Sequence, residues 1–433
     1  MKPARFLSTL APDPQHSICM SPHESRHAIH ATPLAAHVQA ALTPHLTGDA
    51  EQVPPLVDRL LAEAYAAGAS DIHLTARRDG FIAAFRIDGD LIRAAEIPRA
   101  LQDLVIQRLK IMARLVVYQR REPQDGRIDV ELGGRALSLR AAFLPTLRGE
   151  QIVIRFPDPR REQLALADLG MGDALRARFT ALIERPQGAV LLTGPASCGK
   201  STTISAALRH LVANRAADLN ILSIEDPIET EVDGISQTQI DPGAGLGFPE
   251  ALRAALRHDP NVLVVGEIRD PVTAQTAIQA ALTGHLLIAS IHAGSAPGVF
   301  TRLAQMGVER YLLATAVSGV LSQRLARSVC RVCAEESPLS PEFSEALGIE
   351  SDEFEAAVAL GCPRCHGTGC RGRTGAFALL TVTDLIAQAI LENAPEHTLA
   401  ELALQSDQPT LRDALIEHVA AKRIGPQEAL RLL

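Results

Sequence analysis

Residues 188–211 read GAVLLTGPASCGKSTTISAALRHL, and this stretch decides the fold. Ala189–Thr193 is a short apolar run that predicts a buried strand, and the segment from Lys200 to Leu211 predicts a helix. Between them, Gly194–Ser201 matches the eight-position P-loop pattern. A strand before the loop and a helix after it are the context that this pattern requires. A chance glycine-rich turn is therefore the weaker interpretation.

The residues of this loop suit ATP bound with Mg²⁺. Gly194 and Gly199 allow a tight turn, and the N–H groups of the loop and of the helix start attract an anion. Lys200 would reach the β- and γ-phosphates, and the Ser201 hydroxyl would be a Mg²⁺ ligand. We interpret Cys198 as a small residue in a variable position rather than a redox switch. The predicted nucleotide-binding set also contains Pro195, Ala196, Ser197 and Thr202.

Two acidic stretches follow apolar runs downstream of the loop. Glu267 follows the run Leu263–Val265, and a second cluster follows Leu219–Ile224 and consists of Glu225, Asp226 and Glu229. An ATPase needs one carboxylate near Mg²⁺ and one that orients the attacking water. Ligands of parallel sheets bind at the carboxyl ends of the strands. A solvated acid at a strand end is the alternative for each residue taken alone.

Two histidines flank the apolar run Leu286–Ile291, with His285 before it and His292 after it. A lone histidine is more often a surface or core residue than a functional one. His292 ends a predicted strand of the same sheet, which makes it a candidate sensor of the γ-phosphate. His285 is the weaker of the two candidates.

Five stretches of different texture follow one another along the chain. Residues 165–329 alternate apolar runs with helical patterns, which predicts an α/β core with a mostly parallel sheet. Residues 51–158 contain alternating segments around a helical stretch and predict a small α+β domain. Residues 1–50 are rich in proline and histidine and predict a flexible arm. Terminal helices are expected within 373–433.

Four cysteines lie in two CxxC pairs within the remaining stretch, 330–372. The pairs are Cys330 with Cys333 and Cys362 with Cys365. Two such pairs are enough for a closed tetrahedral Zn²⁺ site with four thiolates. We expect a structural zinc without a role in hydrolysis, and Cys370 is a spare ligand. Unligated buried thiols are the alternative.

Composition restricts the partners. The 433 residues carry a formal net charge of −8, only 3% of them are aromatic, and tryptophan is absent. Stacking platforms for single-stranded nucleic acid need exposed rings, so no nucleic-acid partner is expected. No apolar run reaches the length of a membrane span, and no secretory signal follows Lys2 and Arg5. We expect a cytoplasmic chain that contacts a membrane only through partner proteins.

The motifs together resemble the secretion ATPases of type II secretion systems and the relatives that extend type IV pili. Besides the P-loop and the acidic stretches, the resemblance is carried in order by 69–73, 85–89, 123–127, 144–150, 266–270, 281–285, 306–308 and 319–325. It implies a RecA-like core, a PAS-like small domain, and a hexamer at the cytoplasmic side of the inner membrane. Hydrolysis in that family drives the assembly of a pilin-like filament on platform proteins of the inner membrane.

The resemblance also assigns roles to residues. It matches Glu225–Glu229 to an acidic box, Glu267 to the glutamate that polarises water, and His285 and His292 to a histidine box. It further implies that Arg140 and Arg155 of the small domain reach the phosphates. Guanidinium groups there would neutralise charge that develops on the transferred phosphoryl group. Many relatives dock through an extra N-terminal domain, and we do not expect the fifty residues before the small domain to hold one.

Three functions remain open at this point. An ATPase that drives pseudopilus assembly and one that drives pilus extension would share all of these motifs. A non-hydrolysing nucleotide-binding scaffold would keep the P-loop but would show no turnover. A nucleic-acid translocase is disfavoured by the net charge and the scarce aromatic residues.

Overall fold

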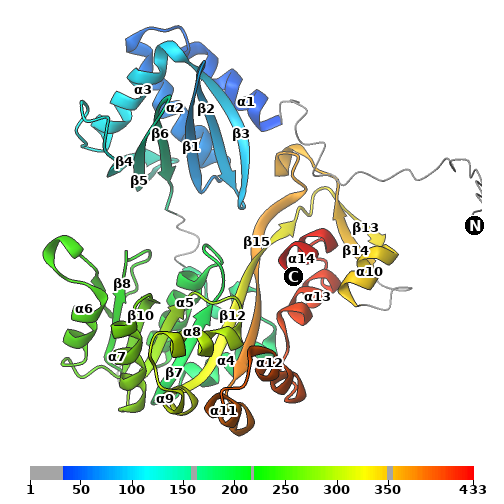
Figure 1. Cartoon of the computed structure of the whole chain (residues 1–433). Coiled ribbons are helices and arrows are strands. Elements are labelled where there is room, and N and C mark those ends of the chain that lie inside the picture. The colour runs from blue at the N-terminus through cyan, green and yellow to red at the C-terminus, as the bar shows by residue number, and fades with distance from the viewer. Residues whose placement is uncertain (1–32, 158–162, 216–218, 349–354) are drawn as a thin grey trace, which may run out of the picture.

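A computed structural model describes residues 33–157, 163–215, 219–348 and 355–433. Its described strands form sheets of six, seven and two strands. Figure 1 shows the six-stranded sheet above the seven-stranded sheet, with the smallest sheet at the far end of a long two-stranded arm. Within the described residues, no helix is both long and apolar enough to cross a membrane.

The N-terminal sheet is antiparallel, with the order β3–β2–β1–β6–β5–β4. Its strands are β1 (Asp71–Arg77), β2 (Gly80–Ile87), β3 (Asp90–Pro98), β4 (Gln124–Leu132), β5 (Arg135–Thr146) and β6 (Gly149–Arg155). One face is covered by the helices α1 (Pro33–Leu42), α2 (Val53–Ala66) and α3 (Arg99–Met112). We call this unit the small domain.

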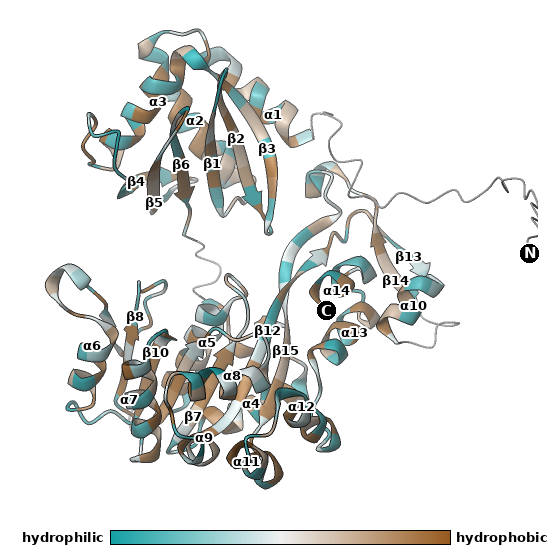
Figure 2. Ribbon diagram, in the orientation of Figure 1, coloured by the Kyte–Doolittle hydropathy of each residue, from teal (hydrophilic) through white to brown (hydrophobic). Residues whose placement is uncertain are grey.

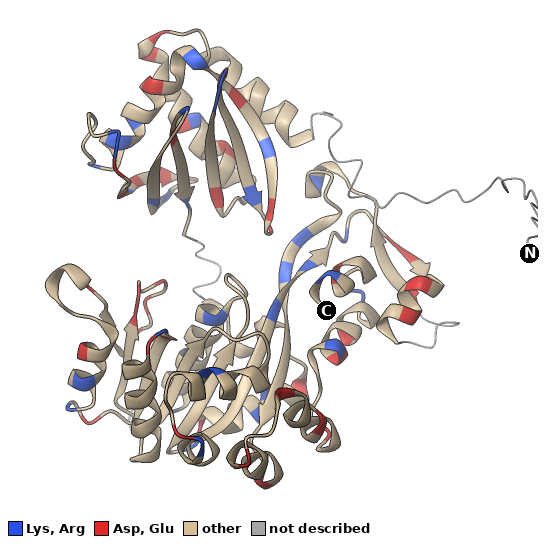
Figure 3. Cartoon of the chain, viewed as in Figure 1, with Lys and Arg blue, Asp and Glu red and all other residues tan. Residues whose placement is uncertain are grey.

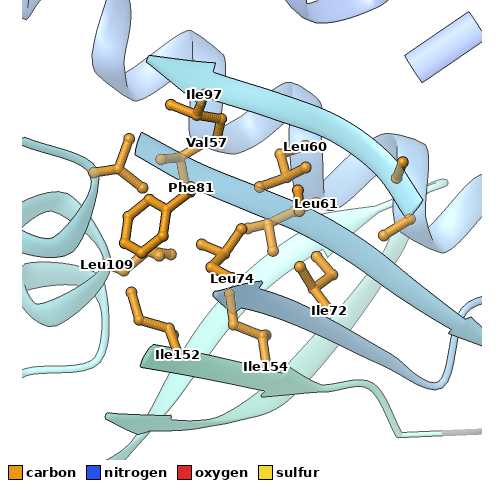
Figure 4. Packing of buried hydrophobic residues seen from close by; sticks show 14 of the residues in the cluster. Val57, Leu60, Leu61, Ile72, Leu74, Phe81, Ile97, Leu109, Ile152 and Ile154 are labelled. Carbon is orange, nitrogen blue, oxygen red and sulfur yellow. The ribbon is translucent and has the colours of Figure 1, made fainter. Parts of the chain in front are cut away.

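Alternation along the strands places the core of the small domain between the sheet and its helices. In β5, Leu137, Leu139, Ala141 and Phe143 are buried, whereas the residues between them are exposed. Figure 4 shows side chains of α2, including Leu60 and Leu61, packed over the sheet. The opposite face of the sheet carries the polar positions.

Two elements of the small domain were not expected from the sequence. Helix α1 lies inside the stretch predicted to be a flexible arm, and Leu34, Val38 and Leu42 are buried on one of its faces. Residues 1–32 of the predicted arm lie outside the described residues, whereas 43–50 continue from α1 toward α2. Strand β3 was missed because charged residues such as Glu96 interrupt its apolar run.

The larger sheet has the order β15–β12–β7–β11–β10–β8–β9. Strands β7 to β12 pair in parallel, and β15 is antiparallel to β12. The strands are β7 (Gly188–Thr193), β8 (Ile221–Glu225), β9 (Ser236–Gln239), β10 (Val262–Ile268), β11 (Leu286–Ile291), β12 (Val317–Val329) and β15 (Cys370–Thr381). Every residue of β7 and β11 is buried, as in a sheet covered on both faces. Figure 2 shows these central strands as strongly hydrophobic.

Helices cover both faces of this sheet, and we call the whole layer structure the core. They are α4 (Asp173–Ile183), α5 (Lys200–Arg215), α6 (Phe248–Ala255), α7 (Pro271–Leu282), α8 (Ala296–Gln305), α9 (Arg310–Ala316), α11 (Asp384–Leu391) and α12 (Glu396–Gln405). The sequence placed the start of the helical C-terminal region at residue 373. In the structure β15 continues to Thr381 within the core sheet, so helices begin only after that strand.

Strands β12 and β15 extend beyond the sheet as an arm that carries the cysteine module. The module contains β13 (Ala334–Pro338), α10 (Pro341–Leu347) and β14 (Glu355–Ala359). The C-terminal helices α13 (Leu411–Ala420) and α14 (Pro426–Leu432) pack beside it. The end of the chain therefore supports the arm.

Two contacts join the arm to the small domain at the β2–β3 turn. The Gly372 N–H donates to Asp88 over 2.7 Å, and the Arg327 guanidinium pairs with Asp90. In Figure 3 the acidic end of this turn lies toward basic residues of the arm. These contacts set the small domain over the core.

Candidate functional site

The predicted phosphate loop leaves the carboxyl end of β7 and enters α5. Gly194 has a φ of 148°, and a Cβ there would lie 2.4 Å from the Gln323 carbonyl oxygen, so only glycine fits. Helix α5 begins at Lys200, whose Nζ lies 3.0 Å from the Gly194 oxygen and 3.1 Å from the Pro195 oxygen. The helix start, its lysine and the glycine turn form an anion cradle at one place.

Strand β12 supports this cradle from the side, which the sequence had not assigned. Gln323 Nε2 donates to the Cys198 carbonyl over 2.9 Å, and Gln323 is almost fully buried. Its neighbour Arg324 donates to the Gly294 carbonyl over 3.3 Å, in the loop after β11. The stretch 319–325 had been noted for its resemblance alone; the register of β12 beside β7 explains its position.

Cys198 is buried in the loop, with 4% of its surface exposed. Burial raises the pKa of its thiol, and the nearby Lys200 and Arg324 offset only part of the shift. A neutral thiol is a poor nucleophile. This agrees with the interpretation of Cys198 as a packing residue.

Glu267 lies at the same edge of the sheet with two cationic partners. One carboxylate oxygen is 3.0 Å from His292 Nε2, and the other accepts from Arg269 Nε over 2.7 Å. The pairing of β10 with β11 shifts between Val265 and Ile268, so Glu267 sits in a bulge. Bulges next to functional sites change the direction of a side chain.

The acidic cluster after β8 divides into three different environments. Glu225 accepts hydrogen bonds from Ser223 and Gln237, at 2.8 and 3.0 Å. Asp226 lies 3.4 Å from Arg269, which links it to Glu267. Glu229 is exposed and, among the described residues, makes no hydrogen bond or ion pair.

His285 does not lie at this edge, so its role as a nucleotide-binding residue stays a prediction that the fold of one subunit does not explain. It precedes β11, and its carbonyl accepts from Gly188 at the start of β7. Its ring is 3.0 Å from the Ala280 carbonyl. Because β7 and β11 are parallel and six residues long, His285 is about 20 Å from the end that carries His292.

The two arginines of the small domain are direct neighbours across β5 and β6. Arg140 and Arg155 are partners in the strand register. Arg140 donates to the Ile228 carbonyl over 3.3 Å, in the core loop that carries Asp226. Arg155 is 65% exposed and pairs through Nε with Asp71 at 2.9 Å. The structure thus places Arg140 against the core, and Arg155 one strand away.

The four predicted zinc ligands converge. The Sγ atoms of Cys330, Cys333, Cys362 and Cys365 all lie within 4.8 Å of one another. Measured separations are 3.9 Å for Cys330–Cys362 and 3.8 Å for both Cys333–Cys365 and Cys362–Cys365. Tetrahedral Zn²⁺ with bonds of about 2.3 Å spaces its sulfurs by about 3.8 Å. The donor set therefore fits zinc, and Cys370 lies outside it.

Residues 47–431 match the profile of the Type II/IV secretion system protein family. The chain belongs to this family. The Type II secretion system ATPase E of Vibrio cholerae is 40% identical over 380 residues, which cover 87% of this chain and 74% of that protein. The type II secretion system protein E of Klebsiella pneumoniae is 43% identical over 381 residues, which cover 87% and 75%. The type IV pilus assembly ATPase PilB of Thermus thermophilus is 40% identical over 368 residues, which cover 84% and 41%.

Solved structures of secretion and pilus ATPases share the fold. The pilus retraction motor PilT with bound ADP has a TM-score of 0.58 and 25% identity, covering 86% of this chain and 96% of its own. DotB of Legionella pneumophila has a TM-score of 0.63 at 17% identity, covering 87% and 94%. Family membership confirms the predicted resemblance, the α/β P-loop fold and the prediction that this secretion ATPase is an ATP hydrolase.

Proposed function

We propose that the chain hydrolyses ATP·Mg²⁺ to power pseudopilus assembly and protein export in type II secretion. One observation carries this proposal. The phosphate loop follows the carboxyl end of β7, and Glu267, His292 and Arg269 lie at the carboxyl ends of β10 and β11, at the same edge of the sheet. The identity of 40% to a Type II secretion system ATPase E supports the process.

In this proposal the anion cradle binds the triphosphate. Backbone N–H groups of Gly194–Ser201 surround the phosphates, Lys200 neutralises them, and Thr202 follows in the first turn of α5. The Ser201 hydroxyl would ligate Mg²⁺, and Glu225 and Asp226 would supply acidic groups near the ion. Magnesium lowers the charge of the phosphates when it is bound.

Glu267 orients the attacking water. Its carboxylate is held from two sides, so its direction is set before ATP arrives. His292 lies beside it and responds to the γ-phosphate, and Glu229 is an exposed acid of the same edge. Arg140 and Arg155 stabilise charge on the transferred group.

The cysteine module holds one Zn²⁺ through Cys330, Cys333, Cys362 and Cys365. Cys330 and Cys333 follow β12 and Cys362 and Cys365 precede β15, so zinc held by them would stabilise this part of the fold rather than take part in hydrolysis. The Cys365 thiol suits a ligand: burial opposes ionisation, but N–H groups of Cys362 and Gly369 lower its pKa to about 7.

The assembly is a homo-oligomer, with six subunits expected, on the cytoplasmic face of the inner membrane. Platform proteins of the secretion or pilus machine bind it, and membrane contact passes through them. Extension of a type IV pilus is the second candidate process, because PilB is also 40% identical over 84% of this chain.

Phosphate release by the purified full chain tests hydrolysis. Glu267→Gln lowers kcat at least about a hundredfold while ATP binding persists, and Lys200→Ala abolishes binding. Glu250→Gln, an exposed acid in α6, is the matched control and stays within about twofold. If wild type and Glu267→Gln both fail to turn over with platform proteins present, the scaffold interpretation replaces this one. Loss of protein export without loss of pili in a deletion strain separates the two motor processes.

A further inference from the structure

A row of four arginines crosses the small-domain sheet, with a single acid among them. The strand register places Arg86, Asp71, Arg155, Arg140 and Arg127 side by side on β2, β1, β6, β5 and β4. Like charges directly opposite one another on adjacent strands are destabilising. The stability of the sheet therefore does not explain why these arginines lie next to one another.

Asp71 is the buried member of this row. Only 5% of its surface is exposed. One carboxylate oxygen accepts from Arg155 Nε at 2.9 Å. The other accepts from the Ser70 hydroxyl at 2.8 Å and lies 3.9 Å from Arg86 Nε. A carboxylate with this many donors is held in one direction.

Within the part of the chain that the structure describes, the Arg155 guanidinium is bound through only one of its three nitrogens. Asp71 uses Nε alone, and among the described residues the two terminal nitrogens of Arg155 have no partner. The Arg155 side chain is 65% exposed. A guanidinium whose Nε is bound and whose two terminal nitrogens are accessible is suited to binding a phosphate group.

A second buried pair in the same domain shows the contrast. Lys110 and Glu150 lie 2.8 Å apart, and both side chains are at most 3% exposed. Neither can reach a ligand, so that pair serves the fold alone. Asp71 differs because its partner points outward, beside Arg140, which contacts the core loop at Ile228.

We propose that Asp71 is a positioning residue: it holds Arg155 so that the terminal guanidinium nitrogens meet the ATP phosphates. This inference rests on the proposed function, in which Arg155 stabilises the transferred group. Asp71 itself touches no substrate. Its effect on turnover passes entirely through Arg155.

A double-mutant cycle on the full chain tests this. Asp71→Asn lowers kcat about tenfold when Arg155 is present, which is about 1.4 kcal/mol, and changes KM less than threefold. In an Arg155→Ala background the same substitution adds less than a twofold loss. Added methylguanidinium partly restores turnover to Arg155→Ala, and this rescue is lost when Asp71→Asn is also present.

Glu63→Gln is the matched control, since Glu63 is a buried carboxylate of the same domain paired with Arg59 and His37. It leaves kcat within twofold at a similar shift in melting temperature. If Asp71→Asn does not fold, Asp71→Glu, which keeps but displaces the charge, enters the same cycle.

Equal losses from Asp71→Asn in both backgrounds overturn the proposal, because Asp71 would then act independently of Arg155. An unchanged kcat in Arg155→Ala overturns it as well. In that case a loss of turnover in Glu267→Gln still upholds the proposed hydrolysis, so the two failures are distinguishable.

Discussion

Arg327 of β12 and Glu428 of α14 form a buried ion pair that joins the arm to the last helix of the chain. Arg327 Nε and a terminal nitrogen lie 2.9 and 2.8 Å from one Glu428 oxygen, and the Arg327 N–H donates to the other. The same guanidinium pairs with Asp90 of the small domain. One side chain thus connects three parts of the molecule.

Arg327→Ala is expected to loosen α14 and the small domain together. It leaves the Glu428 carboxylate, 4% exposed, with Arg431 as its remaining cation, at a cost of about 3 kcal/mol. Hydrogen exchange measures the result: protection falls in 426–432 and at the β2–β3 turn. Arg253→Ala, an exposed arginine of α6, should change neither. Loss of protection confined to α14 would contradict the bridging role.

Zinc content distinguishes the four clustered cysteines from Cys370. Elemental analysis of the purified chain is expected to give one zinc per subunit, and Cys362→Ser loses it. Cys370→Ser keeps it, since that sulfur lies outside the cluster. Chelation lowers the melting temperature of the arm because metal binding contributes to folding. Equal metal loss in both variants would contradict the four-sulfur assignment.

The two histidines that flank β11 should differ in effect. His292→Asn removes one of the two contacts to Glu267, and kcat falls at least about tenfold. His285→Asn leaves kcat of the isolated subunit within twofold, because that ring lies at the opposite edge. Steady-state phosphate release checks both. A large loss in His285→Asn would indicate a contact made only between subunits.

Stability is expected to fall as the pH drops below about 6.5. Burial lowers the pKa of His418, whose Nε2 lies 2.9 Å from the Gly375 carbonyl. The unfolded chain binds this proton more readily, so acid favours unfolding until the folded-state pKa is passed. Thermal unfolding between pH 7.5 and 5.5 measures the slope. His418→Gln should flatten it.

The sequence predicted what lies within short stretches. The P-loop, Glu267 near the end of β10 and the two CxxC pairs are local patterns whose spacing reflects a single turn or strand end. Each appears in the structure where the pattern placed it: the loop between β7 and α5, and four sulfurs within 4.8 Å. Local chemistry is therefore readable without coordinates.

What escaped prediction depends on pairing between distant segments. Gln323 reaches the Cys198 carbonyl across 125 positions of sequence only because β12 lies beside β7. Asp71 meets Arg155 through the register of β1 with β6. The sequence placed His285 and His292 at opposite ends of β11, but the role given to His285 came from the family resemblance and stays a prediction.

Strand β12 carries Gln323 at the phosphate loop and Arg327 at the small domain, and Cys330 of the four-cysteine cluster follows it directly. From Gln323 to Cys330 the chain spans about 23 Å, and pairing with β15 stiffens it. Because Gln323 contacts the phosphate loop, a change in the tilt of β12 at that loop would move the other end of the strand. A tilt of about 5° at the phosphate loop would displace Cys330 by about 2 Å over that length. The cysteine module would move with it.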